Sequence, residues 1–441
     1  MKKIITSASL AALSVVSLQA ANTTGLTATE QAKPWSVSLS LRGFYDDNYA
    51  TINAHRSDGV RPDDSFGVDV SPSFSLNFPM DQTLFSAGYT YGVKYYEGRG
   101  VDASGHRNPI DQSHLAYAKL IHDFTEDYKL DVSDTFVVAQ EAELLTQANQ
   151  AGVPLTNLMR ASGNNIHNIG AINLNGQVTR QLGFLAGYSN NLYDYGDPAY
   201  QALLNRMEHM ITLNLRWQLQ PETVGILGYQ FGLIDQTSKK SLPGIFVDGV
   251  PAYMSPEVRN SRSHYFYVGA DHTFNPQFTG SVRVGMQYTE YPNAGEARAS
   301  GVNFENSNLS PYADANITYN YLPGSTAQLG VKHTRVQTDM LALDQEATTV
   351  YAAVNHKITA KLTASLIGQY QIGTLNEFQT SSGATSNSYV ENYFLLGANL
   401  GYQINQYLKA EAGYNFDRVD SDVNYRSFSR NRIYLGLRAS Y

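Results

Sequence analysis

Serine and histidine stand next to each other at two places in the chain, where they could supply a nucleophile and its general base. Ser113 precedes His114, and Ser263 precedes His264. Both pairs lie in segments whose residue pattern is typical of β-strands, and successive side chains of a strand point to opposite faces. Neither serine can therefore reach the neighbouring imidazole, so a hydrolase is the least favoured function for this chain.

The histidines also repeat at a spacing that could suggest a metal site. His114 and His122 are eight residues apart, as are His264 and His272. At ~3.3 Å per residue, this spacing puts both histidines of a pair on one face of a strand but more than about 20 Å apart, too far to share an ion. The chain has no cysteine and no nucleotide-binding or metalloprotease motif. We expect no catalytic residue, no metal and no cofactor, and so no enzyme.

Charged side chains that recur at alternate positions are a stronger signal, because a polar face repeated over many strands would line a pore. Rings of charge in a pore set its ion selectivity. The pore-lining candidates are Arg42, Asp69, Lys94, Arg216, Arg283, Asp314, Lys357, Lys409, Glu411, Arg432 and Arg438. Basic residues outnumber acidic ones in this set, which favours anionic solutes. The alternative, which the sequence supports equally, is that these charges pair across neighbouring strands and stiffen the wall.

The segments that would position these charges alternate between apolar and polar residues, the pattern of a strand whose two faces meet different solvents. In one of them, Ile211, Leu213 and Leu215 share one face, while Asn214 and Arg216 share the other. We predict eighteen strands, at 36–46, 65–78, 83–96, 112–124, 128–140, 165–180, 182–195, 207–219, 223–237, 262–274, 278–291, 309–321, 325–338, 347–358, 361–374, 389–404, 407–419 and 428–441.

Connections of two kinds join these segments. Tight turns such as 79–82 and 322–324 alternate with long polar loops such as 47–64 and 238–261. An outer-membrane barrel has short turns on its periplasmic side and long loops on its extracellular side. The expected fold class is therefore all-β: a single closed antiparallel transmembrane β-barrel of about 18 strands over residues 35–441.

Aromatic residues and the end of the chain support this fold. Trp35 and Trp217 both fall at the short-turn end of their segments, where a membrane barrel carries an aromatic girdle. The last segment alternates apolar residues and ends on Tyr441, as outer-membrane barrels widely do. We expect the barrel-assembly machinery to bind this terminal strand, and outer-membrane lipid to surround the barrel.

The N-terminus predicts export from the cytoplasm. Lys2 and Lys3 precede an apolar stretch that ends in small residues near Ala20, the pattern of a signal peptide over 1–20 that is too short for a membrane helix. Residues 21–34 form a polar periplasmic lead-in. The net charge of −8, without clustered lysine and arginine, argues against a nucleic-acid partner. The predicted location is the outer membrane of a Gram-negative-type bacterium.

Two segments break the strand pattern. Asp197 and Pro198 begin a stretch, 197–207, that is typical of a short capped helix, and 141–149 could form another. Such helices either fold into the lumen as a constriction or decorate the external loops, and the second arrangement is favoured. The sequence leaves open whether the lumen is plugged, whether the loop segments 141–164 and 197–207 enter it, how many copies associate, and whether the channel serves import or export.

The opening of the predicted barrel resembles a known family. The resemblance lies in the run Leu41-Arg42-Gly43-Phe44-Tyr45-Asp46-Asp47-Asn48 and in the stretch from Ser65 through Ser71-Pro72 and Met80-Asp81 to Tyr89–Tyr96. Both runs resemble the putative β-barrel porin 2 proteins, over the first three strands. The resemblance implies a porin-like barrel, with relatives linked to exopolysaccharide export, and offers no established functional residue to carry over.

A wet lumen with a charged wall predicts a porin-like channel for passive passage of small hydrophilic solutes, with a preference for anionic solutes as the finer expectation. An export pore for an exopolysaccharide is the alternative, because a basic wall suits an anionic polymer. A surface scaffold or adhesin barrel is the second alternative, and an outer-membrane hydrolase is the least favoured. The expected partners are lipid and either a small solute or a polysaccharide.

Overall fold

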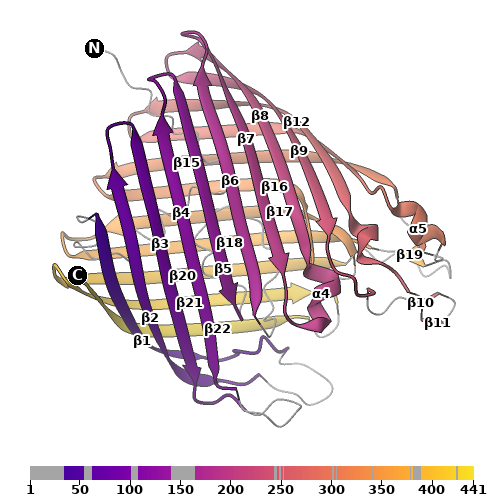
Figure 1. The fold of residues 1–441 in the computed structure, drawn as a ribbon, viewed down its shortest axis with the longest axis horizontal. Coiled ribbons are helices and arrows are strands. Elements are labelled where there is room, and N and C mark those ends of the chain that lie inside the picture. Colours follow the sequence, from indigo (N-terminus) through magenta and orange to yellow (C-terminus); the bar gives the residue numbers. More distant parts are fainter. Residues whose placement is uncertain are drawn as a thin grey trace.

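Eighteen antiparallel strands form one sheet, as the sequence predicts, and the sheet closes into a barrel (Figure 1). The computed structural model describes residues 34–53, 62–100, 108–140, 164–242, 246–247, 250–251, 253–299, 302–303, 305–339, 342–377, 379–380, 389–423 and 426–441. The predicted signal peptide of 1–20, the lead-in up to residue 33 and the predicted helix at 141–149 lie outside these residues. The strands of the barrel are β1 (Trp35–Asp46), β2 (Ser65–Pro79), β3 (Thr83–Tyr96), β4 (Ile110–Asp123), β5 (Tyr128–Ala139), β6 (Asn165–Gln177), β7 (Leu182–Asp194), β8 (Arg206–Gln220), β9 (Thr223–Gln236), β12 (Ser261–Asn275), β13 (Phe278–Glu290), β15 (Ser307–Leu322), β16 (Ser325–Val336), β17 (Ala342–Lys357), β18 (Leu362–Glu377), β20 (Val390–Asn405), β21 (Leu408–Ser421) and β22 (Phe428–Ser440).

Pairing between the first and last strands closes the barrel. β1 pairs with β2 on one side and with β22 on the other, where Asp46 lies opposite Arg432 and Ser38 opposite Ser440. The rings of Trp35 and Tyr441 lie 6.2 Å apart at the short-turn end. Every strand of the barrel therefore has two hydrogen-bonded neighbours. A lipid environment requires this arrangement, because hydrocarbon offers the backbone no partner.

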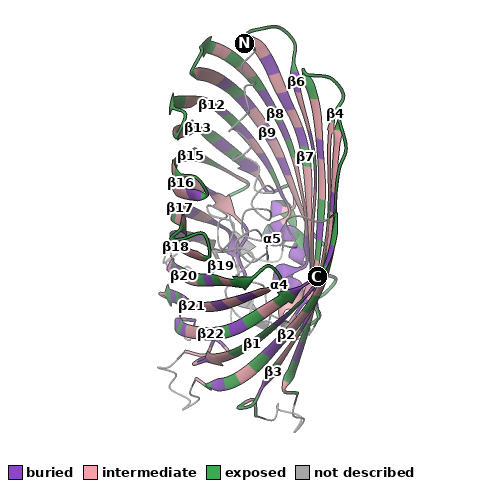
Figure 2. Ribbon diagram, turned by 90° about the vertical axis from the view of Figure 1, so that its left-hand side faces the viewer, coloured by how far each residue is buried: buried purple, intermediate pink, exposed green. Residues whose placement is uncertain are grey.

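Polar residues face the inside of this barrel and apolar residues face outwards, so burial alternates along most of the strands (Figure 2). Along β1, the serines at 36, 38 and 40 are buried, whereas Val37 is 48% exposed and Leu39 is 49% exposed. A water-soluble protein buries its apolar side chains in a core. The reversed pattern indicates that hydrocarbon covers the outer face and water or polar side chains fill the inside.

Side-chain caps explain the short turns. In the β4–β5, β6–β7 and β17–β18 turns, the hydroxyl of Thr125, Thr179 or Thr359 accepts hydrogen bonds from the backbone two and three residues later. In the β15–β16 turn, Gly324 follows Pro323 and has a φ of 78°, as the third residue of a type II turn requires. These bonds are local, so the short turns follow directly from the sequence.

The two prolines inside strands interrupt the pairing beside them. Pro72 leaves a gap in the ladder between β2 and β3, where Val70 and Ser73 are the nearest paired residues. Pairing between β15 and β16 ends at Ala313, short of Pro311. Proline has no N–H to donate, which limits how far a ladder can continue through it.

The largest difference from the predicted strand bounds is at the start of β17. β17 begins at Ala342, earlier than the predicted start at 347. Its added residues do not alternate between apolar and polar, so the period-two pattern does not reveal them. They are paired nonetheless, with Glu346 opposite Arg335 on β16. Here the neighbouring strands, and not a lipid-facing pattern, extend the element.

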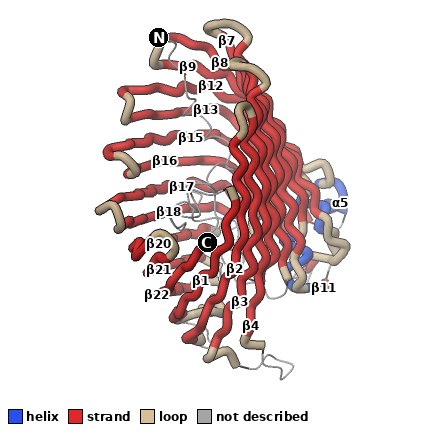
Figure 3. Tube along the Cα trace, turned by 60° about the vertical axis from the view of Figure 1, so that its left-hand side comes forward, coloured by secondary structure: helices blue, strands red, loops and turns tan. Residues whose placement is uncertain are grey.

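Short elements in the long loops gather at one end of the barrel (Figure 3). They are α4 (Pro198–Leu204), which confirms the helix predicted within 197–207, the 3-10 helix η2 (Pro256–Arg259), α5 (Ala294–Ala299), and the small ladders of β10 (Phe246–Val247) with β11 (Val250–Pro251) and β14 (Val302–Asn303) with β19 (Gln379–Thr380). In Figure 2, α4 and α5 are drawn within the outline of the ring of strands, and Figure 1 places them at its loop end, so they lie over part of that opening. None of the described helices is both long and apolar enough to cross a membrane.

Candidate functional site: the lumen wall and the loops at its mouth

Arg42 and Glu411, two of the pore-lining candidates, meet inside the barrel near the junction of the first and last strands. Nε of Arg42 on β1 lies 2.7 Å from Oε1 of Glu411 on β21. The hydroxyl of Ser40 also donates to this carboxylate, at 3.1 Å. The guanidinium of Arg42 lies 5.0 Å from the centre of the Tyr434 ring. These contacts hold one cation at a defined place on the lumen wall.

Two more basic candidates lie beside this ion pair. Arg438 on β22 donates to the hydroxyls of Ser38, at 2.9 Å, and Ser73, at 3.4 Å. Lys409 on β21 lies opposite Arg438 in register. We call Arg42, Lys409, Glu411 and Arg438 the seam patch. Three cations share this patch with one carboxylate, so its net charge is positive.

A second group of charges lies halfway around the ring. Arg216 on β8 and Arg283 on β13 both contact Asp271 on β12, at 3.6 and 3.2 Å. In register, Arg283 lies opposite Asp314, and Asp314 lies opposite Lys332. β12 is nine strands from β1 in either direction. This group therefore faces the seam patch across the lumen, and we call Arg216, Asp271, Arg283, Asp314 and Lys332 the far patch.

The remaining candidates lie in oppositely charged pairs or at the rim. Asp69 lies opposite Lys94 in register, and Arg432 forms an ion pair with Asp417. Lys357 is exposed at the last position of β17, at the short-turn end of the barrel. The wall thus pairs many of its charges across neighbouring strands, and still leaves a positive excess in the seam patch and the far patch.

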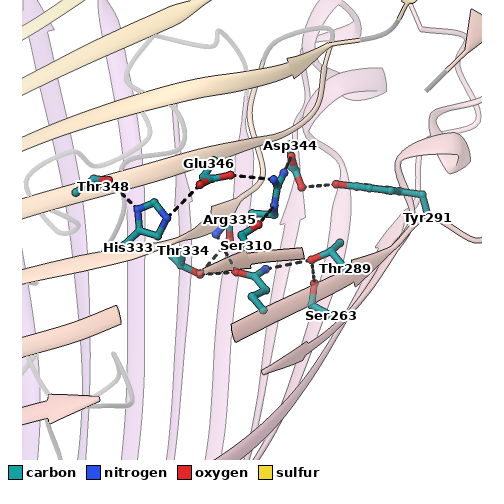
Figure 4. Close-up of polar contacts among 11 residues, drawn as sticks. Ser263, Thr289, Tyr291, Ser310, His333, Thr334, Arg335, Asp344, Glu346 and Thr348 are labelled. Atoms are coloured by element: carbon teal, nitrogen blue, oxygen red, sulfur yellow. Dashed lines mark hydrogen bonds and ion pairs between the residues drawn. The ribbon is translucent and has the colours of Figure 1, made fainter. Parts of the chain in front are cut away.

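A polar network on β12 to β17 joins the wall to the loops (Figure 4). Gln287 on β13 is 2% exposed, and its Oε1 accepts from the backbone N–H of Arg335 at 3.0 Å and from the hydroxyl of Thr334 at 3.1 Å. It supplies the partner that β16 lacks where its pairing with β15 has ended. Arg335 then forms an ion pair with Asp344, at 2.9 Å, and Tyr291 of the β13–β15 loop donates to the same carboxylate.

Apolar residues from three loops and β17 pack together at the loop end of the barrel. We call them the mouth cluster, which comprises Ala202, Leu242, Met254, Val258, Tyr291, Ala294, Ala297 and Leu343. Each of these side chains is almost fully buried. The loops that carry them therefore form one packed unit, which includes α4, η2 and α5.

Arg259, the last residue of η2, clamps these loops together. Its side chain is fully buried, and its Nη1 donates to the carbonyl of Leu203 in α4 while its Nη2 donates to the carbonyl of Thr338 in the β16–β17 loop, both at 2.7 Å. No carboxylate within the described ranges forms an ion pair with it. Burial lowers the pKa of Arg259 to about 10, so the guanidinium remains charged at neutral pH.

A buried group of three charges holds the β16–β17 loop over the barrel. Arg426 in the β21–β22 loop donates to Asp339 in the β16–β17 loop, with 3.1 Å between Nη1 and Oδ2, and it also forms an ion pair with Glu391 on β20. None of the three residues is more than 7% exposed. Burial raises the pKa of Asp339, and the positive charge of Arg426 opposes this shift. The loop must extend past β18 to reach these partners.

Sequence analysis did not find the arginines of the mouth. Arg259 and Arg426 lie in loops, where side chains follow no period of two, so the alternation that selects wall residues cannot select them. A usable signal is an arginine directly beside an apolar residue in a loop, as Arg259 is beside Val258. Such a side chain either packs against other loops or exposes its apolar neighbours to water.

The described residues bring together neither of the serine–histidine pairs. Ser263 contacts the hydroxyl of Thr289 at 2.9 Å, whereas His264 contacts the hydroxyl of Tyr229 at 2.9 Å, on the other face of the sheet. Among all the residues that the structure describes, no group of three histidine, aspartate or glutamate side chains is arranged to hold a metal ion.

Replacing Arg259 with methionine is expected to loosen the mouth cluster. Methionine preserves much of the bulk but donates to neither carbonyl, and hydrogen bonds from charged groups contribute about 1.5–3 kcal/mol each. Hydrogen–deuterium exchange over 198–204 and 253–259 should rise, while exchange over β5 stays unchanged. Arg262→Met, which alters an exposed arginine on β12, serves as the control. Wild-type exchange rates in the loops of the Arg259 variant would show that the hydrogen bonds of Arg259 do not hold these loops together.

A closed antiparallel barrel that exposes apolar side chains and lines its lumen with charged and polar ones defines an outer-membrane protein of the β-barrel pore class. The chain matches the family described as putative beta-barrel porin 2 over residues 36–441. It belongs to that family and is a porin-type barrel of the Gram-negative outer membrane. No curated protein matches the chain.

Several solved porins share similarity with the chain at low identity. OpdK of Pseudomonas aeruginosa, solved with vanillate, has 12% identity and a TM-score of 0.43, with 92% of this chain and 99% of that chain covered. OccAB3 of Acinetobacter baumannii has 12% identity and a TM-score of 0.43 over the same shares. A BenF-like porin from Pseudomonas fluorescens Pf-5 has 9% identity and a TM-score of 0.43, with 93% and 99% covered. At these identities and TM-scores, the solutes of those proteins cannot be assigned to this chain.

Proposed function

We propose that this protein is a passive channel for small hydrophilic solutes and that its lumen favours anions. The observation that carries the proposal is the pair of net positive patches on opposite walls. The patches extend from the middle of the strands towards the short turns, since Arg42 is the eighth of the twelve residues of β1, whereas Glu411 is the fourth residue of β21 and Arg216 is the fifth from the end of β8. A solute on its way to the periplasm passes between these groups of cations, whose field lowers the energy of an anion and raises that of a cation.

The ion pairs in the patches support selectivity rather than oppose it. Glu411 holds Arg42, and Asp271 holds Arg283, so each guanidinium projects from a fixed position. A fixed charge acts on a passing ion without first being reoriented. The mouth cluster covers part of the opposite opening and would limit the size of entering solutes. No feature in the described ranges favours polysaccharide export, surface adhesion or hydrolysis over a channel.

Current recordings from the purified protein in planar bilayers test this proposal. In a KCl gradient, the reversal potential should show a preference for chloride. Arg438→Gln removes one cation of the seam patch. A unit charge about 4 Å from an ion in water acts with about 1 kcal/mol, so the permeability to each ion should change by up to about fivefold. The two changes have opposite signs, so the chloride-to-potassium permeability ratio should fall by up to roughly thirtyfold. Arg262→Gln, which changes an exposed residue near the loop end of β12, should leave the ratio unchanged.

Two results would argue against the proposal, and they differ. A protein that inserts but conducts no current would contradict the channel itself. A conducting protein whose selectivity is the same before and after Arg438→Gln would leave the channel intact and remove the role of the seam patch.

A further inference from the structure

Asp134 of β5 lies on the outer face of the barrel. It is exposed, and Phe136, which shares its face, is 38% exposed. Ala118 on β4 and Gly170 on β6 stand opposite Asp134 in register, so no large side chain covers the carboxylate from either side. The carboxamide nitrogen of Asn168 donates to both carboxylate oxygens, at 3.1 and 3.2 Å.

Two outward histidines on the neighbouring strand β4 mark the edges of the apolar band at this place. His114 contacts the hydroxyl of Tyr89 at 2.7 Å, and His122 contacts the hydroxyl of Thr83 at 2.8 Å and packs 4.6 Å from the ring of Phe124. Rings with one polar end suit the boundary between membrane and water. Eight residues span about 26 Å along a strand. At the tilt of roughly 40° that such strands have, this is about 20 Å of height, most of the ~25 Å apolar band.

Asp134 lies midway between these edges. Its register partner Ala118 is four residues from His114 and four from His122. On the described strands, the other charged side chains at outward positions stand near the loop ends, as Asp194, Asp235, Arg262, Glu290 and Arg418 do. Among the outward charged side chains of the described strands, Asp134 is thus the one that lies at the middle of the apolar band. Asn168 donates to this carboxylate from one side, but hydrocarbon adds no further hydrogen-bond partner, so an exposed carboxyl group at this height favours a protein surface that covers it.

We propose that the outer face around Asp134 binds a second copy of this chain. All copies in one membrane have the same direction and depth, and a two-fold axis along the membrane normal brings Asp134 of one copy to the height of Asp134 of the other. Two carboxyl groups that share a proton hydrogen-bond to each other, so this contact is complementary to itself. The small side chains of Ala116, Ala118 and Gly170 leave room beside Asp134, and small residues let backbones approach closely in membranes.

Disulfide cross-linking in isolated outer membranes tests the contact, because the chain has no cysteine of its own. Ala118→Cys places a thiol beside Asp134 on the outer face. Ala352→Cys is the matched control, an exposed outward alanine on β17, on another side of the barrel. On oxidation, Ala118→Cys should give several-fold more disulfide-linked dimer than Ala352→Cys. Equal dimer from both, or none from either although both thiols react with a maleimide, would overturn the proposal.

Substitutions at Asp134 in the Ala118→Cys protein separate the possible occupants. Asp134→Asn keeps a side chain that can pair with its own kind and should preserve the dimer, whereas Asp134→Leu should reduce it to the level of the control. Both variants must first show the heat-dependent gel shift of a folded barrel. Undiminished dimer from the leucine variant would overturn the role of Asp134. A disulfide adduct of a mass other than twice that of the chain would identify a different protein as the occupant and overturn the second copy.

Discussion

Replacing Arg430 with methionine is expected to lower the free energy of unfolding of the barrel by about 3–5 kcal/mol, the cost of leaving a buried charge without its partner. The side chains of Arg430 on β22 and Asp46 on β1 are 2% and 1% exposed. Nε of Arg430 lies 3.0 and 3.1 Å from the two carboxylate oxygens. The pair joins the two strands that close the barrel, so the substitution leaves Asp46 uncompensated at the closing junction.

Urea unfolding of the protein in lipid vesicles, followed by the heat-dependent gel shift, measures this effect. Arg418→Met is the control, because Arg418 and Asp420 form a pair whose side chains are 50% and 52% exposed. Exposed pairs contribute about 0–1 kcal/mol. Arg430→Met combined with Asp46→Leu should recover most of the loss, since it leaves no buried carboxylate. If Arg430→Met proves no more harmful than Arg418→Met, the buried pair does not stabilise the closure.

Replacing Arg426 with methionine is expected to release the β16–β17 loop and raise the single-channel conductance. The change removes the cation from two buried carboxylates, Asp339 and Glu391, and such a loss costs about 3–5 kcal/mol. If the β16–β17 loop moves into water, Asp339 is hydrated and this loss of free energy is avoided. Adding Asp339→Asn and Glu391→Gln to the same protein should restore wild-type conductance. Wild-type conductance in Arg426→Met alone would show that the loop does not limit the current.

The same variant should respond to pH in a defined direction. Burial raises the pKa of Asp339 in the folded protein, so its contribution to stability is present below its ordinary pKa and is lost as pH rises through the raised value. Removing Arg426 takes away the charge that opposes this shift, and the pKa of Asp339 rises further. Lowering the pH from 7 towards 5 should therefore bring the conductance of Arg426→Met back towards that of the wild type. A conductance that instead increased on acidification would contradict this sign.

The strands, their faces and their short turns follow from local features of the sequence. Alternation assigns each residue of β1 to the lumen or to lipid without reference to any other strand, because successive side chains of a strand point opposite ways. Thr125 and Gly324 form their turns through atoms a few residues away. Where a strand lacked alternation, as at the start of β17, the predicted strand began too late in the sequence.

Closure of the barrel decides which wall charges meet. Arg42 and Glu411 are 369 residues apart in sequence, yet they form an ion pair because the last strands pair with the first. Alternation alone left charge pairing and ion selectivity as equally supported alternatives. The register places three cations and one carboxylate together in the seam patch, and this excess of positive charge supports the proposed selectivity. The local alternation determines on which face of its strand a charged side chain lies. The register between neighbouring strands determines which other charges lie beside it.

The sequence by itself determined a porin-type barrel, the side of the wall on which each strand residue lies, and the positions of the short turns, because each of these depends on residues close together in the chain. Only the tertiary structure decided the rest. Arg259 and Arg426 join loops that are far apart in sequence, and Asp134 stands out only when its height between His114 and His122 is known. Such contacts depend on which distant segments meet, and no periodic pattern in a single chain records that.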